Sequence, residues 1–310
     1  MTPITFTPIY QQRVWGGRKL ETIYQRQLPD TDQPYGESWE ISDRSEAQSI
    51  VTSSNFEGQT LHELWKNHRK ELFGGYHSER FPLLVKILDA QTDLSIQVHP
   101  PQHLASALNG KPKTEMWYIA HAEPNAAIYF GFKQGTTKED FEAALKNGDP
   151  EKFVHTIYPK AGDSIHIPSG RLHAIGAGIV IYEIQQNSDT TYRVFDWNRL
   201  GLDGKPRELH IEESMKCIDF DDIEPEMDNP DGSTLAECPY YKVDHFKLQS
   251  GDTIANPEPE KFSILTIIEG SLVDCENSTY SAGDFVILPV GATALSATCD
   301  AKVLQTTVPN

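Results

Sequence analysis

The chain has 310 residues, 38% of them hydrophobic, which is enough for a folded protein with a sizeable core and for two domains. Its 45 acidic and 27 basic residues give a formal net charge of −18, and a field of that sign repels phosphate backbones and anionic lipids. We therefore expect no binding to nucleic acid or to a membrane surface. An anionic small substrate would need a pocket made locally positive by a metal ion, Arg or Lys.

The first residues, MTPITFTPIYQQRVW, contain no basic segment followed by an apolar run, so we expect no secretory signal. No stretch approaches the roughly 18 apolar residues of a membrane span. The four cysteines, Cys217, Cys238, Cys275 and Cys299, lie far apart and form no C-x-x-C pair. These features favour a cytoplasmic protein with reduced thiols and argue against a metal site built from thiolates.

The first predicted element is a helix after residue 60, because Thr60 and Glu63 form a capping box ahead of Leu64 and Trp65. Runs rich in β-branched and aromatic residues then predict strands at 81–90, 94–100, 115–122, 126–132, 178–186 and 191–197. Helical patterns at 137–148 and 207–217 interrupt and follow these strands. The whole pattern is typical of a β-sandwich or barrel.

An acidic segment with two prolines, DFDDIEPEMDNPDG at 219–232, follows the last of these elements. Its composition predicts an exposed linker. Strand patterns resume after it. We therefore predict a catalytic domain over 1–222 with helical additions, a linker over 223–234, and a C-terminal β domain over 235–310.

One turn occurs twice in the sequence. Residues 161–178 read AGDSIHIPSGRLHAIGAG, and residues 282–297 read AGDFVILPVGATALSA, with the same spacing of Gly, Asp, Pro and Gly. The first copy has His166 and His173 where the second has Ile287 and Ala294. We therefore expect the second copy to be metal-free, and we expect His166 to face packing rather than a metal.

Polar residues that could bind a metal gather near two of the predicted strands. Alternation along 94–100 puts Ser95, Gln97 and His99 on one strand face, and Lys113 and Glu115 share a face at the start of the next strand. The turn of the first copy directs His173. Two imidazoles, a carboxylate and an amide oxygen form a plausible site for a divalent cation, with Gln97 as the weakest ligand. We interpret His121, His155 and His166 as structural.

These motifs carry a family resemblance. The spacing Gly162-x5-Pro168-x-Gly170-x2-His173 matches the second conserved cupin motif, and QVHP…KTEMWY resembles a divergent first one. The segments DLSIQVHP, KPKTEMWYI, IPSGRLHAIGAG and SDTTYRVFDWNR together resemble the short bacterial form of type I mannose-6-phosphate isomerases. The stretches QRVWGG, PYGESWEISD and FPLLVKILDA extend the resemblance over nearly all of residues 1–215.

The resemblance implies a mainly β fold with two cupin-like β-barrel (jelly-roll) units, the first elaborated by a few helices. It also implies one Zn²⁺ ion and the interconversion of mannose 6-phosphate and fructose 6-phosphate through an enediol. The family's metal ligands correspond to Gln97, His99, Glu115 and His173. Its lysine near the metal corresponds to Lys113, its conserved arginine to Arg193, and two acidic positions to Glu183 and Asp189. Ser95 and Arg199 correspond to positions associated with the substrate phosphate in longer members. The helical domain of those members has no counterpart here.

Isomerisation requires a base over the reacting carbons and a positive group near their oxygens. Glu183 and Lys113 are the candidate bases, and we expect a nearby zinc ion to lower the pKa of Lys113. Arg193 could clamp the enediolate or the phosphate. Three alternatives stay open: a non-catalytic protein that binds sugar phosphates, a cupin oxygenase with Fe(II), and an isomerase for another hexose phosphate. The oligomeric state is left open.

Overall fold

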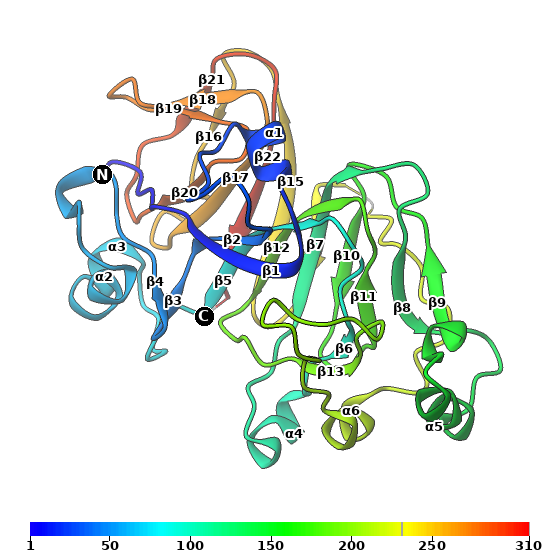
Figure 1. Cartoon of the computed structure of the whole chain (residues 1–310). Coiled ribbons are helices and arrows are strands. Elements are labelled where there is room, and N and C mark those ends of the chain that lie inside the picture. Colours follow the sequence, from blue (N-terminus) through cyan, green and yellow to red (C-terminus); the bar gives the residue numbers. More distant parts are fainter. Residues whose placement is uncertain (231, 310) are drawn as a thin grey trace. The chain divides into compact units, whose positions relative to one another are not determined.

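The computed structural model describes residues 1–230 and 232–309 (Figure 1). The chain divides into two compact units, each built from separate segments. Unit 1 comprises Met1–Ile9, Trp39–Val85 and the chain from Asn229 onward, and unit 2 comprises Tyr10–Ser38 and Lys86–Asp228. The domains expected at 1–222 and 235–310 are continuous in sequence, unlike these units, and stay a prediction. Residue 231 of the expected linker and residue 310 lie outside the described residues.

Unit 2 is built mainly on two antiparallel sheets. The order of the first is β1 (Ile9–Gly17), β2 (Tyr35–Ile41), β5 (Leu83–Ala90), β12 (Ile179–Gln186), β7 (Glu115–Ala122), β10 (Ser164–Ile167). The order of the second is β13 (Tyr192–Phe195), β6 (Ile96–Val98), β11 (His173–Ile175), β8 (Ile128–Phe132), β9 (Val154–Ile157). The unit boundaries in sequence fall inside β1, β2 and β5. Six of the strands coincide with the six predicted runs, so those predictions are confirmed.

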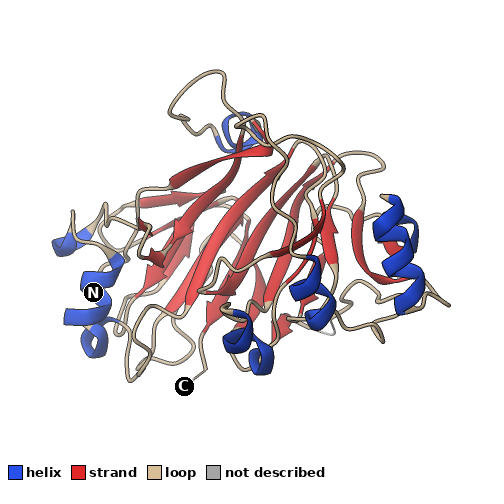
Figure 2. Cartoon of the chain, turned by 60° about the horizontal axis from the view of Figure 1, so that its bottom comes forward, coloured by secondary structure: helices blue, strands red, loops and turns tan. Residues whose placement is uncertain are grey.

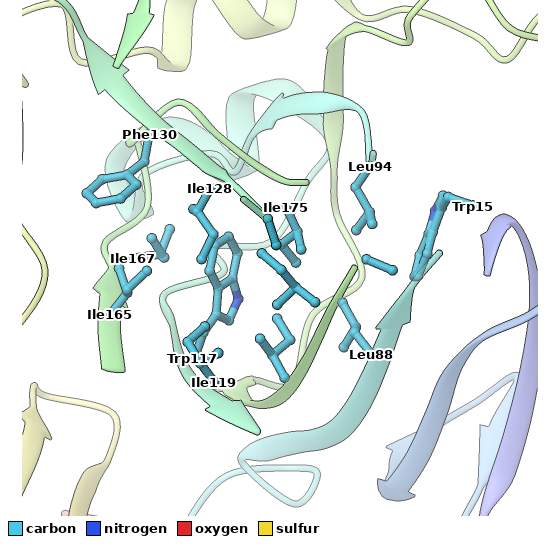
Figure 3. Close-up of a cluster of buried hydrophobic side chains, with 14 residues drawn as sticks. Trp15, Leu88, Leu94, Trp117, Ile119, Ile128, Phe130, Ile165, Ile167 and Ile175 are labelled. Atoms are coloured by element: carbon cyan, nitrogen blue, oxygen red, sulfur yellow. The ribbon is translucent and has the colours of Figure 1, made fainter. Parts of the chain in front are cut away.

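Apolar side chains from both sheets form the core of unit 2 (Figure 3). Alternation along the strands explains its membership: Trp117 and Ile119 of β7 point into the core, as do Ile165 and Ile167 of the neighbouring β10. His166 lies between these two isoleucines and therefore points to the other face of the sheet, as expected.

Two helices pack on a second apolar cluster that includes side chains of β6, β8 and β13. Helix α5 (Lys138–Asn147) begins after Thr137, which forms a capping box with Asp140, and ends at Gly148 in the left-handed conformation. Helix α6 (Ile211–Cys217) begins four residues later than the predicted 207. The backbone N–H of His210 donates to the carbonyl of Arg193 at 2.8 Å, which keeps the residues before α6 extended. Shorter helices of unit 2 are α1 (Lys19–Tyr24) and α4 (Gln102–Ala105).

Unit 1 contains two further antiparallel sheets. Their orders are β14 (Thr234–Glu237), β15 (Lys242–Leu248), β22 (Ala301–Thr307), β17 (Ser263–Glu269), β20 (Phe285–Leu288), and β16 (Thr253–Ile254), β21 (Leu295–Ala297), β18 (Ser271–Val273), β19 (Thr279–Ser281). Its remaining elements are β3 (Asp43–Arg44), β4 (Ala47–Gln48), α2 (Leu61–Asn67) and α3 (Arg69–Leu72). The predicted capping box of Thr60 and Glu63 starts α2. An apolar core that includes Leu265, Val286 and Leu288 contains no metal-ligand residue.

The described part of the acidic segment contains no buried residue, but its backbone is paired with a strand of unit 2. Ile223 forms a parallel bridge with Phe132 at the end of β8, and the N–H of Phe132 donates to the carbonyl of Asp222 at 2.8 Å. Backbone pairing, which composition does not reveal, therefore holds residues 222–224 against unit 2.

Strands outnumber helices in the described chain and the helices are short (Figure 2), which confirms the mainly β prediction. No helix in the described part of the chain is long and apolar enough to cross a membrane.

Candidate metal centre and cavity

Three buried side chains converge in unit 2. His99 directly follows β6, Glu115 begins β7 and His173 begins β11. One donor atom from each lies within 4.8 Å of the others, and the three residues are 1%, 0% and 1% exposed. Two sheets therefore supply two imidazoles and a carboxylate to one point, and this set could hold a metal ion.

The hydrogen bonds of the two imidazoles fix their tautomers. Nδ1 of His99 lies 2.8 Å from the carbonyl of Thr190, and Nδ1 of His173 lies 2.9 Å from the carbonyl of Arg171. A carbonyl only accepts, so each Nδ1 carries the proton and each Nε2 is unprotonated. Nε2 of His99 lies 3.4 Å from Nζ of Lys113 and 3.6 Å from Oε2 of Glu115, and Nε2 of His173 lies 3.6 Å from Oε1 of Glu115. This is the arrangement that metal-binding histidines require.

Burial keeps both histidines neutral. Burial lowers the pKa of His173 to about 3, and the nearby His99 adds to this effect. Burial also lowers the pKa of His99, and the charge of Lys113 lowers it further. Burial alone would raise the pKa of Glu115, but Lys113 and His99 hold it well below its usual value. Oε1 of Glu115 accepts no hydrogen bond from the described residues. A buried carboxylate oxygen of this kind needs a cation or another donor.

The turn between β10 and β11 directs His173. Gly170 in this turn has a φ angle of +101° and Gly162, just before β10, has one of +97°, which glycine adopts without strain. The N–H of Gly170 donates to the carbonyl of His99 at 2.9 Å. The turn is thereby attached to the strand that carries the other histidine.

Gln97 lies beside the cluster but presents its nitrogen. Its Nε2 lies 3.3 Å from Nε2 of His173, and its Oε1 accepts from the hydroxyl of Ser95 at 3.3 Å. Rotation of the amide by a half turn would exchange the two atoms. Gln97 therefore lies beside the cluster, as predicted, and its role as a ligand stays a prediction.

A cavity of about 390 Å³ lies beside the cluster. Its lining residues come from both sheets of unit 2 and from the segment before α6: Arg13, Trp15, Glu37, Lys86, Leu88, Leu94, Ser95, Gln97, Lys113, Ile175, Glu183, Asp189, Thr191, Arg193, Arg207 and His210. Trp15, Leu88 and Leu94 lie together at the right of Figure 3 and form part of its apolar wall. The structure therefore brings together every predicted site residue except one. Arg199 is not in this lining, and its guanidinium donates twice to Asp196, at 3.1 and 2.9 Å.

Sequence reasoning missed Lys86. This residue of β5 is 2% exposed, and its Nζ lies 3.5 Å from Glu183, 3.8 Å from Glu37 and 3.9 Å from Asp189. Arg13 in turn donates to both oxygens of Glu37 at 3.1 Å. A lysine inside the apolar run FPLLVKILDA was the available signal, because a lysine is almost never fully buried unless it is paired.

The two candidate bases have opposite electrostatic surroundings. Burial, followed by the nearby charge of Glu115, raises the pKa of Glu183. Trp117 donates to Oε2 of Glu183 at 3.0 Å, while Oε1 accepts no hydrogen bond from the described residues. Burial acts to lower the pKa of Lys113, but Glu115, whose Oε2 is 2.6 Å from Nζ, and Glu183 outweigh it and raise the pKa. The protein groups alone therefore raise the pKa of Lys113, whereas we expected a nearby zinc ion to lower it.

Arg193 retains unused donors. It pairs in register with Gln97, its Nη1 donates to the carbonyl of Glu208 at 2.8 Å, and its Nε has no acceptor among the described residues. Burial lowers its pKa from the usual value of arginine. A half-buried guanidinium with free donors, beside the cavity, is suited to bind an anionic group.

Comparisons with known proteins agree with these observations. Residues 4–111 match the family described as phosphomannose isomerase type I, catalytic domain. The mannose-6-phosphate isomerase ManA of Bacillus subtilis (strain 168) is 37% identical over 301 residues, which cover 93% of this chain and 93% of that protein. The mannose-6-phosphate isomerase of Streptococcus mutans is 34% identical over 299 residues, which cover 93% and 92%.

Solved structures share the fold. The mannose 6-phosphate isomerase from Bacillus subtilis matches with a TM-score of 0.89 and 34% identity, covering 99% of this chain and 100% of that chain. A variant of phosphomannose isomerase from Salmonella typhimurium, at 17% identity and a TM-score of 0.77, shows the fold alone, over 99% and 100%. The predicted cupin-like fold is confirmed. Since relatives more than 30% identical extend over nearly the whole sequence, the chain belongs to the family of type I mannose-6-phosphate isomerases.

Proposed function

We propose that this chain interconverts mannose 6-phosphate and fructose 6-phosphate through an enediol. One observation carries the proposal: the buried cluster of His99, Glu115 and His173 adjoins a cavity that also contains a buried carboxylate and several cationic side chains. The names of the relatives support the same activity.

The donor set fits a divalent metal ion. Nε2 of His99 faces Oε2 of Glu115 and Nε2 of His173 faces Oε1, and Oε1 has no hydrogen-bond donor among the described residues. We propose Zn²⁺, held by His99, Glu115 and His173, with Gln97 as a fourth ligand through Oε1. Such an ion would supply positive charge next to the substrate oxygens.

Glu183 is the better candidate for the proton transfer between C1 and C2. The raised pKa of Glu183 lies closer to neutral pH, where a general base is most effective. Its Oε1 lies near the Nζ atoms of Lys86 and Lys113, which also line the cavity. Lys113 would remain protonated and stabilise negative charge. Asp189, 3.9 Å from Lys86, would balance part of the positive charge in the cavity.

The remaining cations would bind the anionic parts of the substrate. Arg193 would bind the enediolate or the phosphate with the donors that the protein leaves free. Ser95 lines the cavity and could reach the phosphate, whereas Arg199 would first have to leave Asp196. We also propose a cytoplasmic location, which the four free cysteines support.

The test is a coupled assay for conversion of fructose 6-phosphate to mannose 6-phosphate. We expect activity with Zn²⁺, loss of activity on full chelation, and recovery on adding Zn²⁺ back. His121→Ala, which removes a histidine outside the cluster, is the control and should keep activity. Absence of turnover with metal bound, or turnover after complete metal removal, would contradict the proposal. Binding of fructose 6-phosphate without turnover would instead indicate a sugar-phosphate-binding protein.

A further inference from the structure

The side chain of Arg171 is held at two places in unit 2. Arg171 lies in the turn between β10 and β11, and its Nε and Nη2 donate to the two oxygens of Asp222 at 2.8 and 3.0 Å. Its Nη1 donates to the carbonyl of His166 at 2.9 Å. The Arg171 and Asp222 side chains are 18% and 14% exposed, so water screens this bidentate ion pair only partly.

The backbone of Arg171 acts directly on a proposed metal ligand. Its carbonyl accepts from Nδ1 of His173 at 2.9 Å, and so determines the tautomer and the orientation of that ring. The preceding residue, Gly170, donates to the carbonyl of His99 at 2.9 Å. A shift of this turn would therefore displace both histidines.

Backbone hydrogen bonds hold the segment that carries Asp222. The N–H of Asp219 donates to the carbonyl of Gly170 at 2.9 Å, and Phe132 donates to the carbonyl of Asp222 at 2.8 Å. Gly131 permits this close approach, since a Cβ at that position would lie 2.6 Å from the carbonyl oxygen of Asp222. The segment 219–224 is thus bonded both to the turn and to β8.

The second copy of the turn lacks this ion pair. Ala292 stands where the first copy has Arg171, and Ala294 stands where it has His173. Yet the N–H of Ala292 donates to the carbonyl of Pro289 at 3.0 Å, as the N–H of Arg171 does to that of Pro168 at 3.1 Å. The turn therefore forms without an arginine. The arginine is present in the copy that also has the histidine ligand.

We propose that Arg171 and Asp222 are positioning residues for the metal site. The ion pair holds the Arg171 carbonyl against His173 and ties the acidic segment 219–224 to the turn that carries the ligand. Its role is to slow the loss of the metal rather than to contact the substrate. The inference rests on the proposed function, because it assumes that His99, Glu115 and His173 bind zinc.

The experiment measures the rate at which zinc passes from the loaded protein to an excess of a coloured chelator. Asp222→Asn keeps the shape of the side chain and removes its charge, and we expect zinc release about 10-fold faster than in the wild type. Arg171→Met should release zinc up to about 100-fold faster, and Arg171→Lys should lie between. With zinc in excess, each variant should still bind one ion, because His99, Glu115 and His173 are all retained.

The matched control is Glu21→Gln in α1, which removes the carboxylate of another bidentate pair, formed with Arg18 just before that helix. It should leave the release rate unchanged. A merely structural role would lower the melting temperature of the metal-free protein without changing zinc release. Release at the wild-type rate in both Asp222→Asn and Arg171→Met would therefore overturn the inference while leaving the proposed function intact. A wild-type chain that binds no zinc would overturn both.

Discussion

Residues 161–178 of unit 2 and residues 282–297 of unit 1 form the same turn twice. Gly162 and Gly283 both have positive φ angles, +97° and +89°. In each copy the following aspartate caps the turn: Asp163 accepts from a backbone N–H at 2.9 Å and Asp284 accepts from one at 2.7 Å. The backbone geometry therefore belongs to the scaffold, because it forms with and without a histidine.

The two copies differ in the side chains that their strands direct into the interior. In unit 2, Glu115 pairs in register with Ile167, whereas in unit 1 the corresponding pair is Ser263 and Leu288. Leu288 belongs to an apolar core, and the position of His173 is taken by Ala294. The difference teaches that the metal ligands are additions to a frame that is stable without them.

The largest expected effect is on His173. His173→Ala should abolish zinc binding and lower kcat/KM by at least about 10³-fold, or roughly 4 kcal/mol, because the cluster loses a ligand. The metal-free variant should keep its fold, since the second copy forms with Ala294. Zinc titration, steady-state kinetics and circular dichroism measure these results. The reverse change, Ala294→His, should create no zinc site, and retention of zinc by His173→Ala would contradict the ligand set.

The second contrast concerns equivalent positions in β17 and β7. Leu265→Ala in unit 1 should lower the free energy of unfolding by about 3 kcal/mol, because it leaves a cavity in an apolar core, and should leave kcat/KM unchanged. Trp117→Phe in unit 2 should instead lower kcat by about 10-fold, because Glu183 loses the donor to its Oε2. Urea unfolding and kinetics at low temperature separate the two outcomes. A fall in kcat/KM for Leu265→Ala would break the contrast.

Acid should destabilise the first copy through His173. Its pKa is lowered to about 3 in the fold, so the neutral ring contributes stability that is complete above the unfolded pKa of about 6.5 and is lost as the pH falls toward 3. At pH 5 the metal-free chain should have lost about 2 kcal/mol through this group. Urea unfolding at pH 7 and pH 5 tests this. His173→Gln should show a smaller loss, and an identical loss would contradict the assignment.

The smallest effect should be equal in the two turns. Gly162→Ala and Gly283→Ala each force a side chain into a left-handed conformation, which costs about 1 kcal/mol. A Cβ at Gly162 would meet only one atom, the hydroxyl of Tyr118 at 4.0 Å, so the backbone term dominates there. Thermal or urea unfolding measures both variants. Costs that differ by more than about 1 kcal/mol would show that the two turns are not equivalent.

The sequence predicted those features that depend on local spacing. The alternation in QVHP and the Gly-Asp-Pro-Gly turn indicated His99 and His173, which lie together with Glu115 in the structure, and the Thr60 capping box indicated the start of α2. Each of these signals depends on nearby residues. Lys86 was missed because its partners, Glu37 and Glu183, come from other strands. The pairing of the acidic segment with β8 and its ion pair with Arg171 were not predicted, because composition reveals neither.

The discontinuous make-up of unit 1 has a consequence for synthesis on the ribosome. Unit 2 contains only residues 10–38 and 86–228, so all of its chain exists once residue 228 has been made. Unit 1 uses residues near the amino terminus together with those from 229 onward, so its first segments must wait for the last part of translation. The unit that carries the proposed metal ligands can therefore be completed before the metal-free one, and a chain that stops early would contain every ligand while lacking most of the strands of unit 1.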